Sequence, residues 1–199
     1  MGEATERGQV AYRRQAVRGG ECLEESESEK EEKEGFEVNE TGRQFSARCH
    51  ALRGEAYEAE IAKAFEEENY VPWAWETIPL TDEMSVSVSQ HYFAIGNASD
   101  FVFTPMGRTL ATRIARKLGA VLPTRAIVDA VWEAATIRVQ PVPTTPDKDM
   151  SSPARYQSHT ETIVSQLSEF ADWKRKLCAG YKKDLVQSPS LRPECVGIY

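Results

Sequence analysis

The feature that most constrains the fold is a change of composition near residue 50. The first 34 residues hold ten acidic and six basic side chains, and the stretch 21–34 alone contains eight glutamates but one leucine. Such a segment buries too little apolar surface to offset the entropy lost on ordering. We therefore expect a disordered acidic leader over residues 1–50 and a folded domain over 51–199.

Helical patterns dominate the first and middle parts of this domain. Residues 51–68 place Tyr57, Ile61 and Phe65 on one face, which predicts an amphipathic helix. Thr104 with Pro105, and then Thr124, have the residue types that begin helices. The apolar spacing predicts two helices over about 104–118 and 124–135, packed together as a hairpin, and another over 154–173.

Short strands are expected between and after the helices. Alternating or apolar runs predict strands at 84–88, 91–95 and 100–103, arranged as an antiparallel meander. Further strands are expected at 137–140, 176–186 and 195–199. The sequence therefore predicts an α+β domain in which three to four helices pack on a mostly antiparallel sheet. We expect the following residues at the centre of its core: Phe101, Phe103, Leu110, Ile114, Val128, Val131 and Trp132.

Charge and cysteine content exclude several classes of protein. The net charge of −7 argues against a nucleic-acid partner, because phosphate recognition needs a basic face. No run of residues is apolar enough for a membrane span, and the N-terminus lacks the apolar core of a signal peptide. As written the chain is expected in the cytoplasm, or outside it if the true start differs. The four cysteines are expected to be free thiols, with a pairing of Cys178 and Cys195 as the alternative.

Catalytic signatures are sparse. The sequence has no phosphate-binding glycine loop, no zinc-protease motif and no serine nucleophile elbow, so we expect no cofactor and no metal site. His159 follows a proline-rich loop, at or near the expected start of a helix, where an imidazole can be kept neutral and act as a base. With Lys182 and Asp184 it forms a set of catalytic candidates, and the alternative is a histidine that bonds locally to the loop.

Four residues are candidates for ligand binding. Trp73 and Trp75 lie one residue apart and would share one side of an extended segment, as a stacking platform or as the end of a core. Arg113 and Arg125 lie on the two central helices. The expected cleft lies between the proline-rich loop and these helices. Our first hypothesis is a non-catalytic binding or structural protein, and the alternative is a hydrolase.

Several segments resemble an uncharacterised family of mostly bacterial, often exported proteins. They include YFAIG at 92–96, DFVFTPM at 100–106, LPTR at 122–125, AGYKKDLV at 179–186 and VGIY at 196–199. The resemblance covers about residues 55–199 and implies a member with a different N-terminus and a truncated C-terminus, a fragment of the usual length. It implies a fold but no reaction. For the hydrolase alternative, the substrate would be a cell-envelope polymer.

Overall fold

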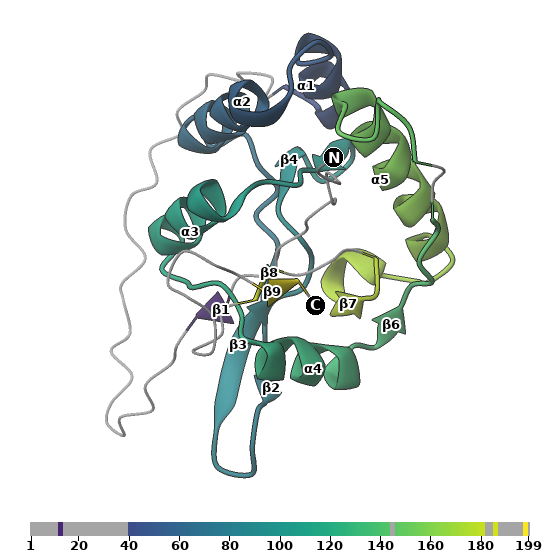
Figure 1. The fold of residues 1–199 in the computed structure, drawn as a ribbon. Helices are drawn as coiled ribbons and strands as arrows, with labels where there is room; N and C mark the ends of the chain where they lie inside the picture. Colours follow the sequence, from purple (N-terminus) through teal and green to yellow (C-terminus); the bar gives the residue numbers. More distant parts are fainter. Residues whose placement is uncertain (1–11, 14–39, 144–145, 182–184, 187–196, 199) are drawn as a thin grey trace, which may run out of the picture.

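A computed structural model of the chain describes residues 12–13, 40–143, 146–181, 185–186 and 197–198. Its fold is α+β, as the sequence predicts, with the helices arranged around short strands (Figure 1). The helices in this part of the chain are α1 (Gly42–Arg48), α2 (Gly54–Glu66), α3 (Arg108–Lys117), α4 (Arg125–Ala134), α5 (Pro153–Leu167) and the 3-10 turn η1 (Trp173–Arg175).

The described strands form four small sheets instead of one. They are β1 (Tyr12–Arg13), β2 (Trp75–Pro79), β3 (Ser85–Ser89), β4 (Ala94–Gly96), β5 (Phe101–Phe103), β6 (Ile137–Arg138), β7 (Cys178–Ala179), β8 (Leu185–Val186) and β9 (Gly197–Ile198). Three sheets are antiparallel, in the orders β1-β3-β2, β4-β5 and β8-β9, and β6 pairs with β7 in parallel.

The predicted three-strand meander is wrong. β3 pairs with the preceding strand, β2, with Thr77 opposite Ser87. β4 pairs with the following strand, β5, with Ile95 opposite Val102. The chain between β3 and β4 does not continue the strand. There His91 turns inward and is 2% exposed, so the two hairpins separate at this buried side chain.

Helix α1 belongs to the folded domain, which therefore begins before residue 51. Thr41 and Gln44 form a capping box, in which each side chain accepts a hydrogen bond from the other residue's backbone N–H. Phe45 and Cys49 are 0% exposed. The predicted leader over 1–50 is therefore wrong for residues 41–50; its residues 1–11 and 14–39 lie outside the described part.

Gly42 explains how closely α1 approaches the strands. Its N–H donates to the Asp100 carbonyl at 2.9 Å, and a Cβ at this position would lie 2.2 Å from the carbonyl carbon of Phe101. That distance is far below van der Waals contact, and the obstructing atom is backbone. The start of α1 thus fits against β5 only because residue 42 has no side chain.

The core divides into two clusters, and α3 and α4 belong to different ones. Leu110 and Ile114 of α3 pack with α1 and α2, whereas Ile127 and Val131 of α4 pack with β2, β3 and the chain around β7. The predicted hairpin of two mutually packed helices is therefore wrong. Trp132 was expected in the core but is 42% exposed, because it lies on the outer face of α4.

The two predicted helix caps, Thr124 and Thr104, have different outcomes. Thr124 is the N-cap of α4, and its hydroxyl accepts from the Ile127 N–H at 3.4 Å, as predicted. Thr104 does not cap α3, since this helix begins after Gly107. The Gly107 N–H instead donates to the Glu58 carboxylate of α2 at 2.7 Å. A carboxylate from another helix therefore satisfies the first donor of α3.

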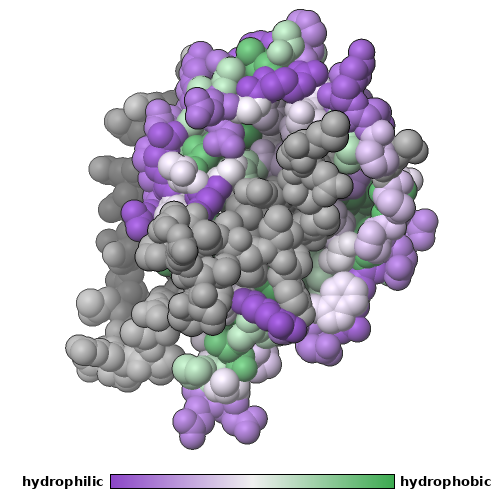
Figure 2. All heavy atoms as spheres, viewed as in Figure 1, coloured by the Kyte–Doolittle hydropathy of each residue, from purple (hydrophilic) through white to green (hydrophobic). Residues whose placement is uncertain are grey.

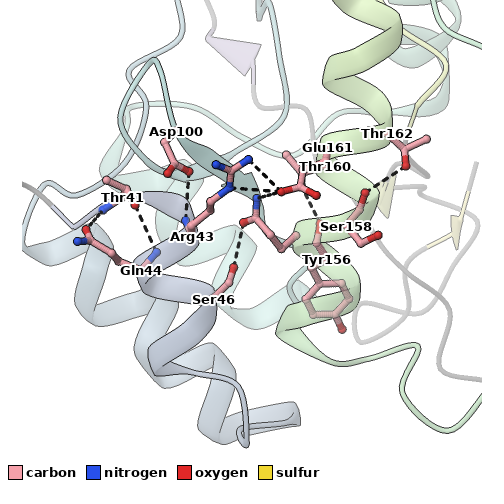
Figure 3. A network of polar contacts seen from close by, with 11 residues as sticks. Thr41, Arg43, Gln44, Ser46, Asp100, Tyr156, Ser158, Thr160, Glu161 and Thr162 are labelled. Atoms are coloured by element: carbon pink, nitrogen blue, oxygen red, sulfur yellow. Dashed lines mark hydrogen bonds and ion pairs between the residues drawn. The ribbon is translucent and has the colours of Figure 1, made fainter.

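A polar network joins α1 to α5 (Figure 3). The Arg43 guanidinium donates to the Glu161 carboxylate at 3.2 and 3.3 Å, and Gln157 donates to the same oxygen at 3.3 Å. Ser46 donates to the Gln157 side-chain oxygen at 3.2 Å. Beneath this network Thr160, 1% exposed, accepts from the Phe103 N–H at 3.1 Å. These contacts dock both helices on β5.

Candidate functional site

An aromatic cluster lies where the two β-hairpins separate. The Trp73 ring lies 4.6 Å from the His91 ring and 5.3 Å from Phe101, measured between centroids. Trp173 stands edge-on to His91 at 5.3 Å, and Phe103 stands edge-on to Phe101 at 5.2 Å. The cluster brings together residues from four separate segments and forms one end of the core.

His91 is the only described histidine that is fully buried, and its two ring nitrogens are both bonded. Nε2 lies 3.2 Å from the Trp173 carbonyl oxygen, which can only accept, so Nε2 carries the proton. Nδ1 lies 3.1 Å from the Tyr181 hydroxyl and accepts from it. Burial lowers the pKa of His91 from 6.5 to about 4, partly opposed by the Trp173 carbonyl. The ring is therefore neutral at pH 7.

A groove of about 540 Å³ opens between this cluster and α3, and we call it the aromatic groove. Its size falls within the range of small-molecule sites. One wall is the chain before and into β2 together with residues at the end of β3, and the other wall is the C-terminal half of α3. Its lining residues are Tyr70, Val71, Pro72, Trp73, Trp75, Ser89, His91, Phe93, Ala111, Ile114, Ala115, Arg116, Lys117, Leu118 and Gly119.

Most polar atoms of the deeper groove are already bonded within the protein. The Trp73 indole N–H donates to the Tyr92 carbonyl at 2.8 Å, and the Ser89 hydroxyl donates to the His91 carbonyl at 2.7 Å. Trp75 differs from Trp73, since its side chain is 37% exposed. The polar groups on the floor of the groove are thus hydrogen-bonded within the protein, so the floor offers a ligand mainly apolar contact. Trp75 presents an accessible ring at the edge of the groove.

Two cations stand at the opposite edge, in the last turn of α3. Lys117 Nζ lies 3.3 Å from the Glu66 carboxylate and 5.9 Å from the centroid of the Phe65 ring. Arg116 is exposed and makes no ion pair with any residue in the described part of the chain. Among the described residues that line the groove, these two carry the only formal charges.

Two of the four predicted binding residues meet in this groove. Trp73 and Trp75 both line it, Trp73 as part of the core end and Trp75 as an accessible ring. Arg113 is exposed on α3 but does not line the groove, and Arg125 lies on α4, with Asp129 at 3.7 Å. The expected cleft beside the proline-rich loop is thus replaced by one beside the segment from Tyr70 to Trp75.

The predicted catalytic set is only partly described. His159 is half-buried in the second turn of α5, which begins at Pro153 with Ser152 as its N-cap, so it lies beyond the first turn. Lys182 and Asp184 lie outside the described residues. The convergence of the three side chains stays a prediction.

The described cysteines, Cys49 and Cys178, are free and buried, as expected. Burial raises the pKa of both thiols, to about 12 for Cys178, so neither is an activated nucleophile. Cys22 and Cys195 lie outside the described residues. In the described segments no group of three histidine, cysteine or acidic side chains is placed to hold a metal ion. The described helices also include none with the length and apolar character needed to cross a membrane.

A second hollow, of about 370 Å³, lies beside the network of Figure 3. Arg43, Asp100, Gln157 and Glu161 contribute to its lining. The charged groups there are already joined, because Arg43 binds Glu161 through its side chain and Asp100 through its backbone N–H at 3.2 Å. This hollow is therefore best explained as part of the junction between α1 and α5.

Sequence reasoning missed His91 and Arg116. His91 lies in an apolar run, HYFAI, that predicts a strand. The one available signal was the presence of a polar ring in an otherwise apolar run, which indicates a side chain that faces inward. Arg116 is one of several basic residues on α3 and has no distinguishing neighbour in the sequence. Arg116 differs from the other arginines of α3 because it lines the same groove as Trp75, which only the tertiary structure shows.

Comparisons with known proteins add no relative: no family model matches the chain, and no curated protein or solved structure is significantly similar to it. The resemblance to the bacterial family therefore stays a prediction. What the chain can do has to be argued from the aromatic groove itself.

Proposed function

We propose that this protein is a non-catalytic binding protein that takes a small, ring-containing molecule into the aromatic groove. The observation that carries the proposal is the arrangement of Trp75 at the edge of a cavity whose deeper polar atoms are bonded internally. An accessible indole beside apolar walls offers stacking and burial of apolar surface, which are the main sources of affinity for a flat ligand.

The chemistry of the lining favours binding over turnover. Among the described lining residues the one histidine is neutral and has both nitrogens occupied, and the Ser89 hydroxyl already donates to a carbonyl. General acid–base catalysis needs a side chain within reach of the substrate that can exchange a proton near neutral pH. The groove supplies shape and apolar contact, and we assign it a binding role.

A neutral fluorescent probe, N-phenyl-1-naphthylamine, tests this proposal with the full chain. We expect saturable binding that Trp75→Ala weakens about fivefold, since a stacked aromatic pair contributes roughly 1 kcal/mol. Trp132→Ala is the matched control, because Trp132 is similarly exposed, at 42% against 37%, but lies on α4 away from the groove.

Circular dichroism of each variant verifies that the fold is retained. Trp75 is partly exposed, so its loss should leave the domain folded. Equal affinities of the two variants, or the absence of saturable binding to the wild-type chain, would refute the proposed function. Trp75→Phe retains a ring and should recover most of the affinity if stacking is the cause.

A further inference from the structure

The charged side chains that line the aromatic groove all have the same sign. The described lining residues include two cations, Arg116 and Lys117, and no carboxylate. We infer that the ligand of this groove is a small aromatic anion, held by Arg116 at the end of α3 while its ring stacks on Trp75. The inference rests on the proposed function and adds the class of ligand.

Arg116 is the group available to such an anion. Lys117 is partly neutralised by Glu66, whereas Arg116 has no ion-pair partner in the described part of the chain. A guanidinium can donate two parallel hydrogen bonds to a carboxylate, sulfonate or phosphate.

The helix end opposes the anion, but by less than the side chains favour it. The C-terminus of α3 carries a partial negative charge of about half an elementary charge from its free carbonyl groups. Arg116 and Lys117 together contribute two full positive charges in the same turn. Even with Lys117 shared with Glu66, the edge of the groove stays positive.

The two walls of the groove would contact different parts of the ligand, one its ring and the other its acidic group. Trp75 and the apolar floor lie on the β2 side, and Arg116 lies on the α3 side. A ligand that satisfies both walls needs a flat apolar body with the acidic group at one edge. A fully polar anion such as inorganic phosphate would leave the apolar floor uncovered, and a neutral ring would leave Arg116 unused.

Two probes with the same ring system isolate the charge. The anion 1-anilinonaphthalene-8-sulfonate differs from neutral N-phenyl-1-naphthylamine by one sulfonate. With the full chain, Arg116→Gln should weaken binding of the sulfonate about fivefold and binding of the neutral probe less than about twofold. Arg113→Gln is the matched control, an exposed arginine on the same helix that does not line the groove, and should change both affinities less than about twofold.

Glu66 offers a variant that should gain affinity. Glu66→Gln removes the carboxylate 3.3 Å from Lys117 Nζ and frees this cation for the ligand. We expect sulfonate binding to tighten about twofold, with the neutral probe unchanged. Because partly unfolded chains also bind this sulfonate, the gain counts only if the circular dichroism spectrum of Glu66→Gln matches that of the wild-type chain.

The outcomes separate this inference from the proposed function. If the neutral probe binds in a Trp75-dependent way but Arg116→Gln leaves sulfonate affinity unchanged, the anion inference is wrong and the binding role stands. Equal losses for both probes, or an equal effect of Arg113→Gln, would also overturn it, since they indicate a change of shape or of overall charge. If neither probe binds saturably, both the function and the inference fail.

Discussion

Removal of the Phe45 ring should lower the free energy of unfolding of the domain by a large fraction. Phe45 is 0% exposed, its ring centroid lies 5.9 Å from that of Tyr57, and the Arg48 guanidinium lies 5.4 Å above it. Truncation of a buried phenylalanine to alanine typically lowers the free energy of unfolding by about 3–5 kcal/mol. Because the free energy of unfolding of a whole domain is about 5–15 kcal/mol, Phe45→Ala should remove a large part of it.

Urea denaturation followed by tryptophan fluorescence measures this loss. Ala47→Gln is the control on the same helix, because Ala47 is exposed and its replacement should change stability by less than about 0.5 kcal/mol. If Phe45→Ala does not fold, Phe45→Leu should fold with a loss of about 1 kcal/mol. A Phe45→Ala variant as stable as the wild type would refute the placement of α1 in the core.

Two further predictions concern a helix cap and a buried titration. Thr124→Ala should lower the free energy of unfolding by about 1 kcal/mol in the same assay, because the Ile127 N–H loses its side-chain acceptor; an unchanged midpoint would contradict this role. The pKa of His91 is about 4 in the folded chain and 6.5 when exposed, so the unfolded state binds the proton first. Stability from this group is therefore complete above pH 6.5 and is lost as pH falls toward 4, by up to roughly 3 kcal/mol. His91→Gln should reduce this pH dependence; equal pH profiles for His91→Gln and wild type would contradict the burial of this ring.

Local signals in the sequence were sufficient for most helices. The cap at Thr124 and the amphipathic spacing of α2 are read within one or two turns of chain, and both predictions are confirmed. Helix α1 was missed because its seven residues contain few apolar side chains and would not form a stable helix alone. Its burial depends on contacts with β5 and α5, which lie about 60 to 120 residues away in sequence.

Strand pairing and the groove needed tertiary information. The strand at 84–88 was predicted, but it was paired with the run at 91–95, whereas β3 pairs with β2. The alternation of β3 is equally compatible with either partner. Trp73 and Trp75 were identified as stacking candidates from their spacing, and both line the groove. Arg116 was not identified, because the sequence contains no signal that places the end of α3 opposite Trp75.

The indole N–H resonances of the tryptophans test the central claim most directly. Trp75 lines the groove, and Trp132, exposed on α4, serves as an internal control in the same sample. Titration of the ¹⁵N-labelled full chain with N-phenyl-1-naphthylamine should shift the Trp75 indole signal saturably and leave the Trp132 signal in place. A shift of Trp132 with Trp75 unchanged, or no shift of either signal at saturating probe, would contradict the aromatic groove as a binding site.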